Sequence, residues 1–363
     1  MTSTTGATNS GPQSPPSGGK DHGVLYIGMD LGTSRTSVAA SNGVRETVLS
    51  VVGYPKDVVS KKLLKKDVLF GKEALEKRLS LRLHRPLAKG VFKYSELPEG
   101  ANRGEIEIAA RDLIREAIRM AQPRKDELVY AVIGVPAQAS IHNKEAILGA
   151  ARASVDSVML CSEPFAVAYG LDMLEDALII DIGAGTTDLC RMHGTMPEEA
   201  DQITISCAGD HVDEKLEELM KTACPGASFS TQMVKEIKER YSHLGDAPER
   251  AIVTLPVDGR PTEFDVTDAI KRACSILVEP IVAGLRRLIG TFDPEFQHKL
   301  RNRVVLAGGG SMIRGLDTAI EGVMRREMGG GRVIHVDEPV YGGANGALKI
   351  AHDMPAEYWA QLR

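Results

Sequence analysis

The 363-residue sequence has no apolar run approaching the ~20 residues that a helix needs to span a bilayer. It also lacks a basic surplus. Its net charge of −5 at pH 7 argues against general nucleic-acid binding, because phosphates need basic partners. The five cysteines form no C-x-x-C pair and no Cys/His ligand cluster. We interpret them as buried or incidental thiols in a reducing compartment, with a structural disulfide or a zinc site as the alternative.

The N-terminal stretch has no apolar segment of the kind found in signal peptides. Residues 1–19 are mainly Ser, Thr, Gly, Pro, Asn and Gln, which cannot bury enough surface to become ordered. We therefore predict a disordered tail over residues 1–22, neither a signal peptide nor an amphipathic anchor. The protein is expected to be cytosolic and not to insert directly into a membrane, and its length is sufficient for two lobes, each with its own core.

Two stretches of the chain, 151 residues apart, share one design. In each, an apolar strand ends in an Asp, passes through a glycine- and threonine-containing turn and returns as a second strand. The first copy consists of the strand 24–30, the turn Asp30-Leu31-Gly32-Thr33-Ser34 and the strand 36–40. The second consists of the strand 177–180, the turn Asp181-Ile182-Gly183-Ala184-Gly185-Thr186-Thr187-Asp188 and the strand 189–192. The repetition indicates a duplicated unit, and two similar lobes facing each other would place both turns at one cleft.

The rest of the chain alternates between helical and strand patterns. Residues 106–120 and 143–153 have helical spacing, and between them 128–135 is an apolar strand that Pro136 ends. This alternation is typical of an α/β lobe. In the second half we expect helices over 212–222, 232–241, 266–288, 316–328 and 344–352, and strands over 303–307 and 332–336.

Charge is unevenly distributed. Residues 45–93 hold thirteen Lys and Arg against five Asp and Glu, a local net charge of +8, which leaves −13 for the rest of the chain. This region is either the solvated surface of a subdomain or a contact for an acidic face of a neighbouring copy or partner.

The two turns have the composition of a polyphosphate site. Backbone N–H groups can approach phosphates closely only where residues are small or permissive, which Gly32, Thr33 and Ser34 provide in one turn and residues 183–187 in the other. Asp30 and Asp181 precede the turns at strand ends, and two carboxylates beside phosphates suit a hydrated Mg²⁺. Either turn alone is weak evidence, whereas the matched pair indicates nucleotide binding.

Two further features depend on that context. Gly308-Gly309-Gly310-Ser311 lies between a strand and a helix and is either a plain turn or a close approach to a ligand. It has neither the G-x-G-x-x-G spacing nor the G-K-[ST] ending of other nucleotide motifs. Glu163 follows the strand 157–161 and precedes Pro164. Its carboxylate either polarises an attacking water or is a surface acid that caps the helix beginning at Phe165.

These turns, in this order, resemble the motifs of the actin, sugar-kinase and heat-shock-70 ATPase superfamily. Asp30–Ser34 is similar to the first phosphate motif, 181–188 to the second, and 304–311 to the adenosine motif, so that the resemblance covers nearly all of residues 24–352. Within the superfamily, the stretches 303–316 and 337–351 are similar to the rod-shape actins of the MreB type. The stretches 51–58 and 354–362 resemble the magnetosome actins, which we identify as the best match.

The resemblance implies an α/β fold of two lobes, built from duplicated ribonuclease-H-like subdomains with a nucleotide cleft between them. Subdomain IA would comprise 24–52, 96–163 and 338–363, and subdomain IB 53–95. Subdomain IIA would comprise 164–208 and 265–337, and subdomain IIB 209–264.

The resemblance also implies roles for individual residues. Asp30 and Asp181 would hold the Mg²⁺ shell, and Glu163 and Asp181 would be catalytic. The nucleotide-binding residues would be Gly32, Thr33, Ser34, Gly183, Ala184, Gly185, Thr186, Thr187, Gly209, Asp210, Lys235, Lys238, Glu239, Gly308, Gly309, Gly310 and Ser311. Rod-shape actins carry a glutamate where this sequence has Asn143. An amide can orient a water but cannot take its proton, so the catalytic duty falls on Glu163, or hydrolysis is slow.

The implied function is that of a bacterial actin, which binds and hydrolyses ATP to control the assembly of homopolymeric filaments. Such filaments would align and position magnetosome vesicles through an adaptor protein. The alternatives are a rod-shape actin and a monomeric ATPase of the heat-shock-70 type. Sugar kinases need an acidic base at the sugar site and usually a longer chain, and the sequence offers neither.

Overall fold

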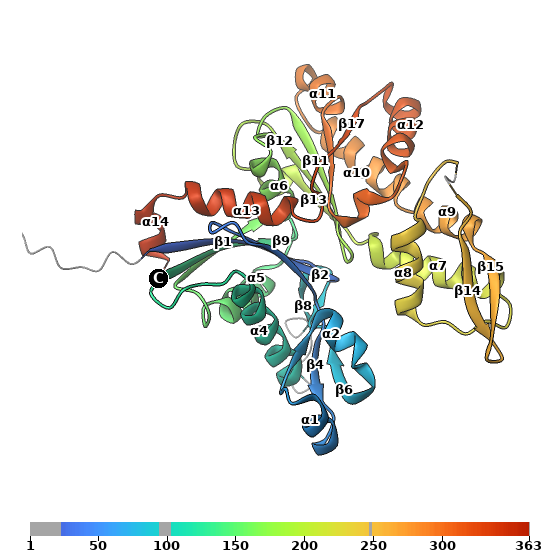
Figure 1. Ribbon diagram of the computed structural model, residues 1–363. Coiled ribbons are helices and arrows are strands. Elements are labelled where there is room, and N and C mark those ends of the chain that lie inside the picture. The colour runs from blue at the N-terminus through green and yellow to red at the C-terminus, as the bar shows by residue number, and fades with distance from the viewer. Residues whose placement is uncertain (1–22, 94–102, 247–248, 363) are drawn as a thin grey trace, which may run out of the picture.

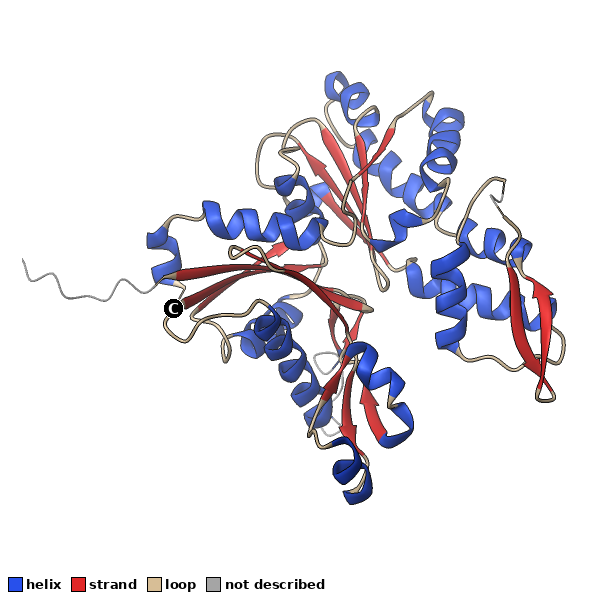
Figure 2. Ribbon diagram, in the orientation of Figure 1, coloured by secondary structure: helices blue, strands red, loops and turns tan. Residues whose placement is uncertain are grey.

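The computed structural model describes residues 23–93, 103–246 and 249–362. The predicted disordered tail, residues 1–22, lies outside these ranges. Two five-stranded sheets form the centre of the molecule (Figure 1), and helices flank both of them (Figure 2).

The first sheet has the strand order β10-β9-β1-β2-β3. β1 pairs antiparallel with β2 and parallel with β9; β2 pairs antiparallel with β3, and β9 parallel with β10. The strands are β1 (Val24–Leu31), β2 (Arg35–Ala40), β3 (Arg45–Leu49), β9 (Leu128–Val135) and β10 (Ser157–Ser162).

The second sheet repeats this topology in the order β13-β12-β11-β16-β17. β11 takes the place of β1, with β12 antiparallel on one side and β16 parallel on the other. The strands are β11 (Ala177–Ile182), β12 (Thr187–Met192), β13 (Gln202–Ile205), β16 (Val304–Ala307) and β17 (Val333–His335). The predicted duplication is therefore confirmed.

β1 is buried on both faces because its side chains alternate between two sets of helices. Leu25, Ile27 and Met29 pack with α4 (Arg103–Met120) and α5 (Ile141–Ala151). The alternate face meets α13 (Gly342–Asp353), and a Cβ atom on Gly28 would lie 2.1 Å from the carbonyl oxygen of Ala344. Only glycine allows α13 to cross the strand so closely.

The crossing of α13 and α6 (Glu163–Gly170) joins the two sheets. α13 packs on β1 and β9 of the first sheet, and α6 packs on β11 and β12 of the second. A Cβ atom on Gly346 would lie 1.7 Å from the carbonyl oxygen of Ala166, so the two helix backbones are in direct contact. Trp359, in α14 (Ala356–Gln361), is fully buried beside this junction and stacks on Tyr130 with ring centroids 4.9 Å apart.

The core of the second lobe lies beneath β11. Leu178, Ile180 and Ile182 pack with α10 (Val278–Gly290) and α12 (Leu316–Met328), and α11 (Pro294–Arg301) completes this layer.

Two smaller units project from the central sheets (Figure 1). One contains the sheet β5-β4-β6 and the hairpin β7-β8, and it includes most of the basic region 45–93. Its elements are β4 (Val52–Pro55), α1 (Val58–Leu64), β5 (Leu69–Phe70), α2 (Gly71–Glu76), β6 (Leu81–His84), β7 (Leu87–Ala88) and β8 (Val91–Phe92). The other consists of α7 (Gly209–Ala223), α8 (Thr231–Tyr241), the hairpin β14 (Ile252–Val257) and β15 (Arg260–Asp265), and α9 (Thr267–Ser275).

One predicted helix was wrong. The single helix expected over 266–288 is two helices, α9 and α10, separated at Ile276 and Leu277. Pro280 explains the break, since proline lacks an N–H and clashes with the preceding turn in a helix interior but is tolerated in a first turn, where the structure places it.

Two further findings concern the cysteines and the helices. All five cysteines are free thiols, so the disulfide alternative is excluded. Within the described ranges, no helix combines the length and the apolar character needed to cross a membrane.

Candidate functional site

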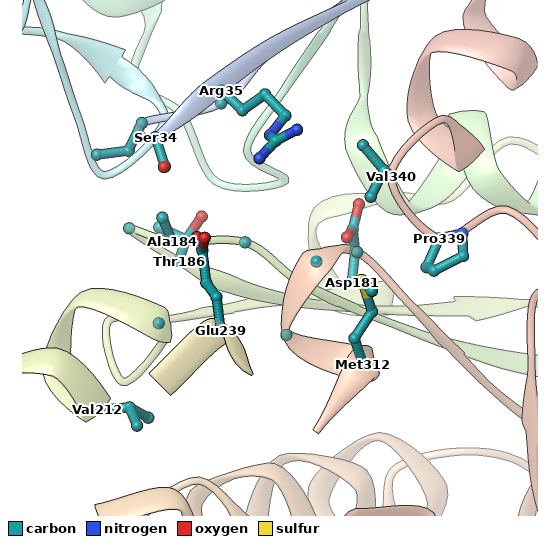
Figure 3. A pocket seen from close by; sticks show the side chains of 18 of the residues that line it. Ser34, Arg35, Asp181, Ala184, Thr186, Val212, Glu239, Met312, Pro339 and Val340 are labelled. Carbon is teal, nitrogen blue, oxygen red and sulfur yellow. The ribbon is translucent and has the colours of Figure 1, made fainter. Parts of the chain in front are cut away.

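A cavity of about 330 Å³ opens between the two sheets, where the hairpin turns after β1 and β11 face each other (Figure 3). The start of α7, one face of α8 and the turn after β16 complete its walls. Seventeen of the residues predicted from the sequence line it: Asp30, Gly32, Thr33, Ser34, Glu163, Asp181, Gly183, Ala184, Gly185, Thr186, Gly209, Lys235, Lys238, Glu239, Gly308, Gly309 and Gly310.

The three other predicted residues support the walls from behind. Thr187 is fully buried, and its hydroxyl donates to the carbonyl of Cys207 at 2.9 Å. Ser311 is buried, and its hydroxyl donates to the carbonyl of Gly308 at 2.7 Å, which holds the glycine turn in shape. The backbone N–H of Asp210 donates to the carbonyl of Ala184 at 2.7 Å and so ties α7 to the second turn.

The two hairpin turns are in contact. The backbone N–H of Gly90 donates to Thr33 Oγ1 at 2.8 Å, and a Cβ atom on Gly185 would lie 2.4 Å from the same oxygen. The close approach of the turns therefore depends on the missing side chain at Gly185.

The turn after β16 packs directly on the end of β11. Gly308 has φ +77°, in the left-handed region, and a Cβ atom there would lie 2.3 Å from Asp181 Oδ1. A Cβ atom on Gly310 would lie 2.2 Å from Cγ2 of Ile182. Both positions require glycine. Gly308 is required for its backbone conformation and for space, and Gly310 for space alone.

Three carboxylates, those of Asp30, Glu163 and Asp181, line the floor of the cavity, and the carboxylate of Asp188 lies next to them behind the wall. Glu163, Asp181 and Asp188 are buried, and Asp30 is half-buried. Asp30 and Asp181 end equivalent strands, and Asp188 lies opposite Asp181 in the β11–β12 ladder. Burial raises the pKa of Asp30 to about 6. The pKa values of Glu163 and Asp181 lie well above their usual range, first because of burial and second because of repulsion by Asp30.

Nothing in the described part of the chain neutralises this cluster. No Lys or Arg there forms a salt bridge with any of the four acids, and Glu163 Oε1 and Asp188 Oδ2 are buried without a hydrogen-bond partner. Uncompensated buried carboxylates are unfavourable, so the arrangement fits a site that receives positive charge from a ligand.

The donor set fits a hydrated cation better than an enclosed one. No group of three or more His, Cys, Asp or Glu side chains within the described residues is close enough to surround a metal. Mg²⁺ usually keeps several waters and takes one or two carboxylates together with ligand phosphates, which matches Asp30 and Asp181 beside the glycine turns.

The opposite wall of the cavity is basic. Lys235 of α8 hydrogen-bonds through its ammonium to the hydroxyl of Ser34, and so connects α8 with the first turn. Lys238, one turn along, forms a salt bridge with Asp213 at 2.7 Å and donates to the carbonyl of Gly209 at 3.0 Å. Burial lowers the pKa of Lys235, and the neighbouring Lys238 lowers it further. Glu239 extends from α8 into the cavity (Figure 3).

Glu163 is not the helix cap that one interpretation of the sequence expected. It is the first residue of α6, Ser162 occupies the N-cap position, and the side chain of Glu163 is only 8% exposed and faces the cavity. Asn143 lies in the first turn of α5, 7% exposed, and does not line the cavity.

A segment of the first lobe is also held by the second. After β9, the backbone N–H of Ala137 donates to Asp188 Oδ1 at 2.9 Å. Gln138 and Thr204 exchange two hydrogen bonds, from the N–H of Gln138 to Thr204 Oγ1 at 3.1 Å and from the N–H of Thr204 to Gln138 Oε1 at 3.2 Å. One oxygen of the acid cluster therefore takes part in the contact between the lobes.

Several lining residues were missed by the sequence analysis. Val212, Leu277, Met312 and Ile313 add apolar side chains to the lining of the cavity, and Pro339 and Val340 also line it. These residues carry no motif and meet only in the folded chain. Asp188 and Arg35 could have been identified as candidate site residues from the sequence. Strand pairing places Asp188 opposite Asp181, and Arg35 directly follows the first turn.

Comparison with known proteins identifies relatives along almost the whole chain. The family model described as MreB/Mbl protein matches residues 25–357. The "Actin-like protein MamK" of Magnetospirillum gryphiswaldense is 40% identical over 338 residues, which cover 93% of this chain and 92% of that protein. The structure is similar to that of a MamK double helical filament, with a TM-score of 0.86, 39% identity and coverage of 91% and 99% of the two chains. It is also similar to a non-polymerising MamK mutant bound to AMPPNP, with a TM-score of 0.69, 38% identity and coverage of 92% and 100%.

Proposed function

The chain belongs to the MreB/Mbl family of actin-like proteins, and we propose that it binds and hydrolyses ATP in the cavity between its lobes and assembles into filaments. The observation that carries the proposal is the meeting of two matched glycine turns beside a cluster of four acids that have no protein counter-charge. A polyphosphate with its cation supplies both the anion that the turns can bind and the positive charge that the acids require.

Different parts of the cavity wall contact the phosphates, the base and the ribose of the nucleotide. Backbone N–H groups of residues 32–34 and 183–186 bind the β- and γ-phosphates. The apolar lining residues Val212, Leu277, Met312 and Ile313 accommodate the flat base, and Glu239 of α8 receives ribose hydroxyls. Lys235 and Lys238 reach toward the ribose and adenine from the same helix.

Asp30 and Asp181 would hold Mg²⁺ through its water shell, and the cation would neutralise charge on the phosphate oxygens. Glu163 would orient and polarise the attacking water, because its carboxylate lies on the cavity floor with one unpartnered oxygen. Its raised pKa favours proton acceptance, since a base with a very low pKa takes up protons poorly. Asn143 lies away from the cavity, so we assign the water to Glu163.

Assembly would depend on closure of the lobes around the nucleotide. The contacts of Thr33 with Gly185, of Ser34 with Lys235 and of Ala137 with Asp188 cross the cleft beside the ligand. Bound ATP would stabilise the closed form that polymerises, and hydrolysis would weaken it. A MamK double helical filament is among the solved structures similar to this chain, which supports polymerisation of this chain as well.

We propose further that the filaments lie in the cytoplasm and align magnetosome vesicles through an adaptor protein. This role rests on 40% identity to MamK over nearly the whole chain. The expected absence of nucleic-acid binding agrees with the net charge of −5.

Sedimentation tests the proposal against the alternative of a monomeric ATPase. At micromolar concentration, the protein should pellet with ATP and Mg²⁺ or with AMPPNP and Mg²⁺, and electron micrographs of the pellet should contain filaments. It should remain in the supernatant without nucleotide. Nucleotide binding without pelleting would favour the monomeric ATPase, and the absence of nucleotide binding would contradict the assignment of the cavity.

A further inference from the structure

Arg35 is the first residue of β2 and directly follows Ser34 of the first glycine turn. Its side chain is exposed and extends from the strand into the cavity (Figure 3). Side chains alternate along a strand, so Arg35 shares its face of β2 with Ser37, which also lines the cavity and donates its hydroxyl to the carbonyl of Val340 at 3.1 Å. The strand therefore holds the guanidinium on the cavity side.

Arg35 differs from the two other basic residues that line the cavity. Lys235 is bound to Ser34, and Lys238 is bound to Asp213 and to the carbonyl of Gly209. The guanidinium of Arg35 makes no hydrogen bond or salt bridge to any residue in the described ranges. The five N–H donors of Arg35 are therefore available to a ligand, whereas Lys235 and Lys238 already bind groups of the protein.

The acids on the floor do not capture this cation either. Asp30 and Asp181 line the same cavity, yet neither forms a salt bridge with Arg35. A guanidinium that faces a polyphosphate cavity and is not neutralised from within the protein is available to an anionic ligand. Its planar fork matches pairs of phosphate oxygens and binds them with two parallel hydrogen bonds.

We propose that Arg35 is a phosphate-binding residue, whose guanidinium closes over the cavity and pairs with non-bridging oxygens of the phosphate chain of a nucleoside di- or triphosphate. This inference rests on the proposed function of the cavity. Arg35 acts on the side of the phosphates that faces solvent, while the turn amides bind the opposite side. Arg35 is exposed to solvent before the ligand binds, so the ion pair with the phosphates has only a modest desolvation cost. The contribution of this ion pair to the binding affinity depends on ionic strength.

The test compares Arg35→Gln with Arg82→Gln, a matched control. Arg82 lies on β6 of the same lobe, is exposed and does not line the cavity, so the control makes the same change in net charge. Binding of AMPPNP, ADP and adenosine is measured by calorimetry with Mg²⁺ at low and moderate salt, below the concentration at which filaments form. Thermal unfolding of each variant checks that it is folded, and Arg35→Lys provides a second variant that retains charge.

Arg35→Gln should weaken AMPPNP and ADP at least about tenfold at low salt, because charge-assisted hydrogen bonds to phosphate are among the stronger polar contacts. It should leave adenosine unchanged and reduce the salt dependence of ADP binding. Arg35→Lys should fall between Arg35→Gln and the wild type, because a point charge replaces a fork. Arg82→Gln should match the wild type.

Equal affinities of Arg35→Gln and the wild type for ADP would overturn the role of Arg35 and leave the proposed function intact. Equal weakening of adenosine and ADP would also overturn it, because the effect would then be structural. A wild-type protein that binds neither AMPPNP nor ADP would overturn both proposals.

Discussion

Gly185 of the second hairpin turn packs against Thr33 of the first: a Cβ atom on Gly185 would lie 2.4 Å from Thr33 Oγ1 and 2.6 Å from the Cα atom of Lys89. The two halves of the duplicated fold therefore touch at the point where each one turns beside the cavity. Only the side chain of Thr33 lies between the two turns, so closure of the lobes is sensitive to a single carbon atom added at Gly185.

Gly185→Ala should force the two turns apart. Its backbone φ is not in the left-handed region, so the effect is steric and arises from contacts with the backbone of Lys89 as well as with Thr33. We expect AMPPNP affinity to fall about tenfold or more and the free energy of unfolding to fall by about 1–3 kcal/mol, typical of overpacking. Calorimetry and denaturant unfolding measure the two quantities.

Gly149→Ala is the matched control. Gly149 lies inside α5, and no atom comes within 4 Å of the position of an added Cβ. Alanine should stabilise that helix by about 0.5–1 kcal/mol and leave AMPPNP binding unchanged. If Gly185→Ala binds AMPPNP as tightly as Gly149→Ala does, the contact between the turns is not important for the nucleotide.

Glu163→Gln should slow phosphate release by about a hundredfold or more, the range expected for loss of a general base. The amide keeps the shape of the side chain but cannot accept the proton. Assembly should persist and filaments should last longer than those of the wild type, because closure needs bound ATP rather than hydrolysis. Since the substitution also removes one acid from a repelling cluster, the nucleotide-free variant should be at least as stable as the wild type.

Phosphate release and sedimentation of Glu163→Gln measure these effects separately. A wild-type rate of phosphate release would exclude Glu163 as the base and direct attention to a water bound elsewhere in the cavity.

Stability of the nucleotide-free protein should fall as pH rises from about 5 to about 7.5. The pKa of Asp30 in the folded chain is about 6, against 3.8 ordinarily, so its ionisation is less favourable in the folded state. A raised carboxyl pKa gives a contribution that is present below about 3.8 and lost as pH rises through about 6. For Asp30 alone the full loss, from below pH 3.8 to above pH 6, is about 3 kcal/mol at about 1.4 kcal/mol per pKa unit, and about half of it falls between pH 5 and pH 7.5.

Asp181 and Glu163 add to this loss in the same direction, since their pKa values are also raised. Denaturant unfolding in EDTA measures the free energy at the two pH values, and Asp30→Asn should reduce the difference. Mg²⁺ with AMPPNP should restore stability at the higher pH. If the nucleotide-free protein instead gained stability over this pH interval, the negative charge of the acid cluster would have to be compensated by other groups of the protein.

Trp359→Ala should destabilise the first lobe by about 3–5 kcal/mol, the usual cost of deleting a large buried aromatic side chain. The indole is fully buried on Tyr130, and its Nε1 donates to the carbonyl of Ala351 at 3.3 Å. Tyr358→Ala, at a neighbouring side chain that is 54% exposed, should change stability by less than about 1 kcal/mol. Similar losses for the two variants in denaturant unfolding would contradict the packing described for α14.

Predictions from the sequence were accurate where the local residue pattern matched the burial of those residues in the structure. The strand 128–135 and the helix 316–328 have the predicted bounds, since each has strong periodicity and a clear stop: Pro136 ends the first and Gly329 caps the second. The fold class and the meeting of the two turns were predicted because the repeated strand-turn-strand pattern needs no tertiary information beyond the duplication.

The residues that were missed depend on tertiary contacts. The apolar part of the cavity lining comes from Val212, Leu277 and Met312, which belong to three separate segments. Their spacing along the sequence does not indicate that they line the same cavity. The single helix over 266–288 was predicted because apolar periodicity continues through the break, although Pro280 indicated where a new helix could begin. The roles assigned to individual site residues remain predictions.

The most direct test of the account records light scattering and phosphate release on one sample after ATP and Mg²⁺ are added, with Asp181→Ala as the control. The account predicts that scattering rises first and phosphate release follows it, both above one threshold concentration of protein, and that Asp181→Ala releases phosphate at least about a hundredfold more slowly while remaining folded. Phosphate release in proportion to protein concentration with no rise in scattering, or normal turnover by Asp181→Ala, would contradict a filament-forming ATPase that works through this cavity.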